Sequence, residues 1–206
     1  MTAFISGRPL ARSFYARDTI SVARDLLGAV LETRIRGLVT SGRIVETEAY
    51  VGPHDPAAHG FGNRRSARND QLFGEPGTAY VYFTYGMHWC FNAVTEREGY
   101  PAAVLIRALE PLEGIQGMRR RRGGADPRVL CAGPARLCQA LGITGAMNGA
   151  LLDSGRVRVI AAPKPSGARI IVSPRIGITK AVDWPLRFCL SGSEWLSRME
   201  KRKGKR

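Results

Sequence analysis

The chain has 206 residues, 44% of them hydrophobic, and carries 31 Lys and Arg against 17 Asp and Glu, a formal net charge of +14. This length and apolar content suit one globular domain with its own core, and no apolar run approaches the roughly 20 residues of a membrane span. The N-terminus lacks the apolar core of a secretory signal, so we expect a cytoplasmic protein. The charge, nearly all from arginine, favours a polyanionic partner such as nucleic acid or an anionic membrane, although a bias toward arginine codons would give the same excess.

Residues 13–27 predict the first helix. Apolar side chains recur there at helical spacing, Asp18 or Thr19 can cap its start, and Gly28 is placed to end it.

Two strands follow at 29–35 and 38–50, and the second one carries the chemistry. Near its end Glu46, Glu48 and Tyr50 alternate with small or branched residues, so a strand puts both carboxylates and the phenol on one face. An ordinary half-buried strand with a solvated acidic face has the same pattern.

A long surface loop and a hairpin come next. Residues 52–77 are rich in Gly, Pro, Asn and Arg and have neither period, which predicts a loop that is more often functional than idle. Strands at 78–84 and 89–94 then enclose a tip at 85–88, where a large aromatic side chain stands beside glycine.

The second half of the chain continues with short elements. Residues 103–109 predict a nearly continuous apolar strand interrupted by Arg107, and a charge in such a run is normally paired or placed at a site. The other predicted elements are a short helix from Pro111 to about Arg122, a helix opened by Gly133-Pro134 and closed by Gly142, and strands at 156–162, 169–173 and 186–191.

The cysteines contain no C-x2-C pair and stand mostly among apolar neighbours. This favours reduced, buried side chains over zinc ligands or disulfides for Cys90, Cys131, Cys138 and Cys189.

Several blocks together resemble the alkyladenine (3-methyladenine) DNA glycosylase family. The first are Val-Glu-Thr-Glu-Ala-Tyr at 45–50 with Gly-Pro and Ala-Ala-His just after it, and Tyr-Val-Tyr at 80–82 with Tyr-Gly-Met after it. The blocks at 107–114, 133–141, 175–177 and 185–188 continue the match in the same order. The resemblance covers most of residues 13–196.

The resemblance implies a monofunctional glycosylase of base excision repair, which flips a damaged purine nucleotide out of double-stranded DNA and hydrolyses its N-glycosidic bond. The family's substrates are 3-methyladenine, 7-methylguanine, hypoxanthine and ethenoadenine. In the hydrolytic step Glu48 is the expected general base, or an electrostatic stabiliser of the oxocarbenium-like charge. Arg107 and the backbone carbonyl of Ile176 are expected to hold the attacking water.

The same resemblance assigns the base-binding residues. Tyr50 and Tyr82 are expected to sandwich the flipped base with His59, and Asn92 to exclude normal guanine by a clash with its exocyclic amino group. Tyr85 is expected to intercalate through the minor groove, a wedge that trades unstacking for a kinked duplex.

Two other classes of function fit part of the sequence. A metal-dependent nuclease or phosphohydrolase could bind a divalent ion through His54, Asp55 and His59 with Glu46 or Glu48, although two histidines five residues apart across a proline do not share a helix face. A non-catalytic nucleic-acid-binding module would explain the charge and the aromatic residues. Chelator sensitivity and the release of free base separate these readings.

We therefore expect a single-domain α+β fold with a curved, mainly antiparallel β-sheet, flanking helices and a protruding β-hairpin. Residues 1–197 are expected to form the glycosylase domain, and 198–206 a basic C-terminal tail. We expect a monomer that uses no cofactor and no metal.

Overall fold

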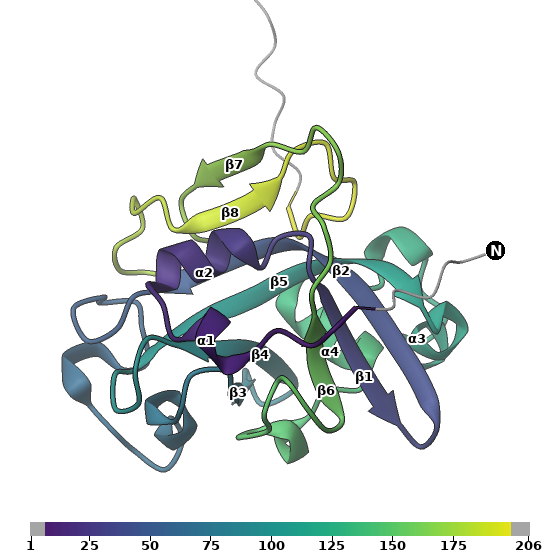
Figure 1. Ribbon diagram of the computed structural model, residues 1–206. Helices are drawn as coiled ribbons and strands as arrows, with labels where there is room; N and C mark the ends of the chain where they lie inside the picture. The colour runs from purple at the N-terminus through teal and green to yellow at the C-terminus, as the bar shows by residue number, and fades with distance from the viewer. Residues whose placement is uncertain (1–6, 199–206) are drawn as a thin grey trace, which may run out of the picture.

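The computed structural model describes residues 7–198, whose strands form one curved antiparallel sheet (Figure 1). The expected α+β fold is thereby confirmed. The strand order is β3-β4-β5-β2-β1-β6, with β8 joined to β2 and β7 joined to β8. The strands are β1 (Val30–Ile35), β2 (Leu38–Tyr50), β3 (Ala79–Thr84), β4 (His88–Thr95), β5 (Ala102–Glu113), β6 (Val157–Ile160), β7 (Ile170–Ser173) and β8 (Arg187–Leu190).

The long strands β2 and β5 form the centre of the sheet. On the edge of β2 that does not pair with β5, the partner strand changes along its length. Its first half pairs with β1, whereas Glu46–Glu48 pairs with β8. Between these halves the register of β2 with β5 shifts around Glu46, an irregularity of the kind that bends a strand. The β7–β8 hairpin consequently lies above the central strands, away from β1 and β6 (Figure 1).

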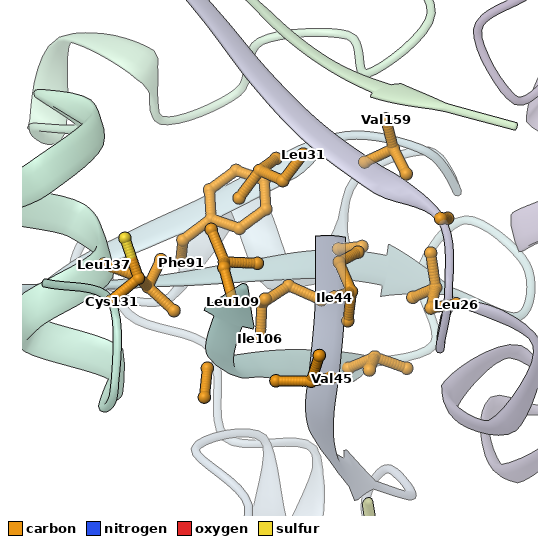
Figure 2. Packing of buried hydrophobic residues seen from close by; sticks show 14 of the residues in the cluster. Leu26, Leu31, Ile44, Val45, Phe91, Ile106, Leu109, Cys131, Leu137 and Val159 are labelled. Carbon is orange, nitrogen blue, oxygen red and sulfur yellow. The ribbon is translucent and has the colours of Figure 1, made fainter. Parts of the chain in front are cut away.

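The main hydrophobic core lies on one side of the curved sheet. Side chains from β2, β4 and β5 meet those of the helices there, as Figure 2 shows for Ile44, Val45, Phe91, Ile106, Leu109 and Leu137. Each of these side chains is almost fully buried. The cysteines Cys90, Cys131 and Cys138 are buried thiols, and Cys189 also belongs to the core, so the expected burial is confirmed.

The helices differ from the sequence prediction in two places. The first predicted helix is two, α1 (Arg12–Tyr15) and α2 (Thr19–Asp25), because Asp18 leaves the helical conformation and caps α2 through the backbone N–H of Ser21. The helix predicted from Pro111 is wrong at its start, since β5 continues through Pro111 and α3 (Ile115–Arg121) begins only after the left-handed Gly114.

The predicted helix between Gly133 and Gly142 is confirmed as α4 (Pro134–Leu141). It packs against β4, β5 and α3. The predicted long loop at 52–77 contains two short 3-10 helices, η1 (Phe61–Asn63) and η2 (Asp70–Phe73), and two more follow α3 and α4, η3 (Pro127–Val129) and η4 (Gly145–Met147). In residues 7–198, no helix is both long and apolar enough to cross a membrane.

Candidate active site

A cavity of about 600 Å³ opens on the face of the sheet opposite the core. Its wall follows the two-residue period of the strands, because alternate side chains of β3, β4 and β5 point into it. The loop before η1, the start of α4 and the segment 176–180 complete the wall. The lining residues from β3, β4 and β5 are Tyr80, Tyr82, Thr84, Cys90, Asn92, Ala103, Leu105 and Arg107.

Glu48 lies directly behind this wall. It is fully buried and accepts hydrogen bonds from the Tyr50 hydroxyl (3.0 Å), Arg107 Nη1 (3.2 Å) and the backbone N–H of Ile176 (2.7 Å). Burial raises the pKa of Glu48, although these three donors and the charge of Arg107 favour its ionised form. A carboxylate with a raised pKa and cavity-lining neighbours is suited to accept a proton near neutral pH.

Arg107 bridges two carboxylates on β2. Its Nε lies 3.0 Å from Glu46 Oε1, and its Nη1 lies 3.2 Å from Glu48 Oε2. The predicted placement of Glu46 and Glu48 on one face of the strand is thus confirmed. Burial disfavours the charge of Arg107, but the two carboxylates together raise its pKa above the usual value.

Three aromatic rings gather on one side of the cavity. The His59 and Tyr82 ring centroids are 4.5 Å apart with the planes at 72°, and His59 Nδ1 lies 2.8 Å from the Tyr80 hydroxyl. Burial and the nearby Arg68 lower the pKa of His59, so its ring is neutral at neutral pH. Tyr50 also lines the cavity, with its hydroxyl turned toward Glu48. Together these rings form an apolar, polarisable slot of the kind that holds a nucleobase.

Asn92 stands at the base of this slot. It is buried on β4, and its Nδ2 donates to the Tyr80 carbonyl at 3.0 Å. This bond across the β3–β4 ladder fixes the orientation of the amide, so Asn92 presents a constant shape to the cavity.

The tip of the β3–β4 hairpin reaches beyond the cavity. Tyr85 lines its rim and is 83% exposed. Tyr85 and Gly86 both have positive φ, at 51° and 66°, and the N–H of Met87 donates to the carbonyl of Thr84 at 3.2 Å, as in a type I′ turn. A bulky residue at positive φ is conformationally costly.

Sequence reasoning missed an ion pair beneath the site. Arg175 makes a bidentate contact with Asp55, both fully buried, and stacks its guanidinium on the Tyr50 ring at 4.6 Å. It also donates to the carbonyl of Ala49. Arg175 belongs to a block that resembles the family, but only the fold brings it to Asp55, 120 residues away. Arg187, whose contacts involve Glu46, was missed for the same reason.

Most of the residues considered for a metal site are engaged by other partners. Both oxygens of Asp55 bind Arg175, Glu46 and Glu48 bind Arg107, and His59 faces the tyrosines. Across residues 7–198 there is no group of three His, Cys, Asp or Glu side chains that could hold a metal ion.

Residues 13–194 match the family described as Methylpurine-DNA glycosylase (MPG). Similar chains include one from Rhodopseudomonas palustris (strain HaA2) named "Putative 3-methyladenine DNA glycosylase", 50% identical over 93% of this chain and 91% of its own. Chains with the same name from Methanoculleus marisnigri and Carboxydothermus hydrogenoformans are 49% and 47% identical, over 92% of this chain and 98% of theirs.

Proposed function

Because the chain belongs to the methylpurine-DNA glycosylase family, we propose that it is a DNA repair enzyme that flips an alkylated or deaminated purine out of duplex DNA and hydrolyses its N-glycosidic bond. The observation that carries the proposal is a buried carboxylate, Glu48, in direct hydrogen-bond contact with residues that line an aromatic cavity. The product is an abasic site and a free base.

The flipped base is proposed to lie between Tyr50 on one side and Tyr82 on the other, with His59 next to Tyr82, since the His59 and Tyr82 rings are in contact with centroids 4.5 Å apart. Support comes from their common position on the cavity wall and from the neutral imidazole, which adds no repulsion toward a positively charged alkylpurine. Asn92 is proposed to exclude guanine, since its fixed amide leaves no room to adjust around an extra amino group.

Tyr85 is proposed to fill the gap that the flipped nucleotide leaves in the stack. The exposed tip places this ring next to the cavity mouth, so one protein surface can hold both the base and its vacated place.

Hydrolysis is proposed to use a water held by Glu48, Arg107 and the backbone carbonyl of Ile176. Glu48 accepts a proton from the water while the water oxygen bonds to the anomeric carbon. The purine leaves with the electron pair of the C–N bond. The ionised carboxylate also stabilises the positive charge that develops on the sugar.

Double-stranded DNA is the proposed partner, and the charge around the cavity mouth supports it. Exposed arginines lie in the loop that carries His59, and Arg68 donates to the Phe83 carbonyl at the base of the hairpin. More positive charge lies on α4, whose Pro134 lines the cavity. Arg136 of this helix lies near Arg122, and its charge, after the larger effect of burial, lowers the pKa of Arg122. Such charges bind phosphates without reading sequence.

The direct test is the release of free base from defined duplexes that contain 3-methyladenine, 7-methylguanine, hypoxanthine or ethenoadenine, in single-turnover assays with and without chelator. We expect release that a chelator does not affect. No product from any lesion would contradict the proposal, and loss of activity with chelator would favour metal-dependent chemistry.

The absence of a covalent intermediate is a second test. Before the tail the sequence has only Lys164 and Lys180, and neither matches a catalytic position of the family. Borohydride should therefore trap no protein–DNA adduct; a trapped Schiff base would indicate lyase chemistry instead.

A further inference from the structure

We propose that Glu46 is a positioning residue, which fixes the guanidinium of Arg107 against Glu48 and balances its charge. The inference rests on the proposed function, because Arg107 matters only if Glu48 acts in hydrolysis.

The contacts of Glu46 leave it no freedom to act as a base. Its Oε1 accepts from Arg107 Nε at 3.0 Å, Arg187 Nε at 2.8 Å and Ser197 Oγ at 2.7 Å, and its Oε2 accepts from the Ser197 N–H at 2.7 Å. The side chain is fully buried. Although burial opposes its charge, the hydrogen bond from Arg187 and the charge of Arg107 hold the pKa of Glu46 below its usual range. Glu46 is therefore a fixed negative charge.

This fixed charge determines the direction of the Arg107 side chain. An arginine side chain has several rotatable bonds, and Glu46 holds the Nε of Arg107 so that Nη1 reaches Glu48. The two strands have an irregular register at this point, with Glu46 paired to Ala108, so regular cross-strand pairing does not hold Arg107 by itself.

Glu46 also links parts of the chain that are far apart in sequence. Arg187 lies on β8 opposite Glu48 in the register and is held by Ser173 Oγ at 2.9 Å, and Ser197 comes from the segment after β8. One carboxylate therefore fastens β5, β8 and the end of the described chain to β2, behind the reacting atoms.

The charges of this cluster cancel. Glu46 and Glu48 supply two negative charges, and Arg107 and Arg187 supply two positive ones. An uncompensated guanidinium beside an oxocarbenium-like transition state would oppose the reaction. Because Glu46 balances its charge, Arg107 can hold a water next to the anomeric carbon without adding net positive charge to the cluster.

The experiment compares Glu46→Gln with the wild-type protein in single-turnover release of 7-methylguanine, whose fixed positive charge removes any need to protonate the leaving base. We expect the rate to fall on the order of 100-fold, with the dissociation constant for the lesion duplex changed by less than about 3-fold. Glu46→Asp, which keeps the charge, should recover part of the rate.

A matched control exists on β1. Glu32 also accepts hydrogen bonds from two arginines, Arg34 at 2.8 Å and Arg158 at 2.5 Å, but it lies away from the residues that line the cavity. Glu32→Gln should leave the rate of base release unchanged.

The pH dependence separates positioning from general damage. The groups that face Glu48 are Arg107 on β5, Tyr50 and Glu46 on its own strand, and the Ile176 N–H of the 176–180 segment. Of these groups, only Glu46 disfavours the ionised form of Glu48. Loss of the Glu46 charge alone would lower the pKa of Glu48. Release of Arg107, whose charge has the larger effect, should raise this pKa and move the acidic limb of the rate profile to higher pH. A variant that is only less well folded would lose rate without moving this limb.

Two further measurements apply if Glu46→Gln does not fold. Ser197→Ala removes the hydroxyl that contacts Glu46 at 2.7 Å and Arg107 at 3.4 Å, and should lower the rate several-fold without loss of DNA affinity. NMR of the DNA-free protein should show faster exchange of the Arg107 Nε proton in Ser197→Ala than in Glu32→Gln.

The outcomes distinguish this inference from the proposed function. If the wild-type protein releases no base, the proposed function fails, and the Arg107 exchange alone decides the role of Glu46. Wild-type rate, an acidic limb that does not move to higher pH or unchanged Arg107 exchange in the folded variants would overturn the role of Glu46 while leaving the glycosylase assignment intact.

Discussion

Glu48 and Arg107, which we call the floor of the cavity, and the tip of the β3–β4 hairpin belong to one sheet but differ in burial and in the number of contacts. Glu48 is fully buried and Arg107 is 7% exposed, each held by several hydrogen bonds. Tyr85 is 83% exposed and sits at an unfavourable φ of 51°. The floor is thus tightly held where we propose that hydrolysis occurs, and the tip is exposed where we propose that it enters the duplex. Changes at the floor should therefore alter chemistry, and changes at the tip should alter flipping.

The largest expected effect is at the floor. Glu48→Gln keeps the shape of the side chain but can neither take a proton nor stabilise positive charge, so base release should fall by at least about 10³-fold. Lesion-duplex binding should persist. Single-turnover rates and binding isotherms on the same duplex make the measurement.

The binding measurement is the control for this variant. If affinity fell as much as the rate, Glu48 would be holding the fold together, and the floor would not differ from an ordinary buried ion pair. Substantial turnover by Glu48→Gln would contradict the catalytic assignment.

Tyr82→Ser should give the next largest effect, because it damages the slot itself. Stacking of a base on an aromatic ring is worth about 1–3 kcal/mol, so activity should fall roughly 10- to 100-fold. The loss should be similar for a paired lesion, a bulged lesion and a single strand. A loss confined to paired duplexes would move Tyr82 from the slot to the flipping step.

The pH dependence tests the floor from another direction. Since burial raises the pKa of Glu48, its base form is lost as pH falls through a pKa above about 4.3, the usual glutamate value. The rate of 7-methylguanine release should therefore fall about tenfold per pH unit below that limb. His59, whose pKa is lowered, remains neutral until lower pH. A rate independent of pH down to the usual glutamate range would mean that proton acceptance by Glu48 does not limit the reaction.

Sequence patterns predicted the strands and the faces of their side chains, because a period of two is local information. The alternation of Glu46, Glu48 and Tyr50 placed them on one face before any fold was known. The cap at Asp18 was predicted and is confirmed at the start of α2, but the separate short helix α1 before it was missed. Pro111 was predicted to start a helix, but it lies inside β5, where it pairs with Gly42 of β2.

The candidate site residues came from the family resemblance, but the buried ion pairs that support them could not be predicted. The resemblance named several residues that line the cavity, whereas Arg175, which pairs with Asp55, and Arg187, which pairs with Glu46, lie more than a hundred residues from these partners in the sequence. Such contacts depend on how β8 and the segment before it return to β2, which no local pattern specifies. Arg175 and Arg187 therefore became meaningful only in the fold.

A smaller, conditional effect is expected at the tip. Tyr85→Ser is too short to fill the vacated stack, so flipping should shift back toward the stacked duplex and release should fall about 10-fold, the equivalent of 1.4 kcal/mol. The defect should be larger for a well-paired lesion than for the same lesion in a bulge, where less unstacking is needed.

The comparison of substrates is the control for Tyr85→Ser. Equal activity with wild type on a well-paired duplex would mean that Tyr85 is not the wedge, and Met87, also exposed at this tip, would be the next side chain to test.

The smallest expected effect is on stability, and it has the opposite sign. Tyr85 and Gly86 both have positive φ, and Asn-Gly is the sequence that such a turn prefers. Tyr85→Asn should therefore raise the free energy of unfolding by about 0.5–1 kcal/mol and the melting temperature by roughly 1–4 °C, while base release falls as in Tyr85→Ser. Thermal unfolding of the two variants side by side makes the measurement, with Tyr85→Ser as the control that loses the ring without gaining the asparagine. If Tyr85→Asn were no more stable than wild type, the turn would hold tyrosine without strain, and the tip would be as well fitted to its conformation as the floor.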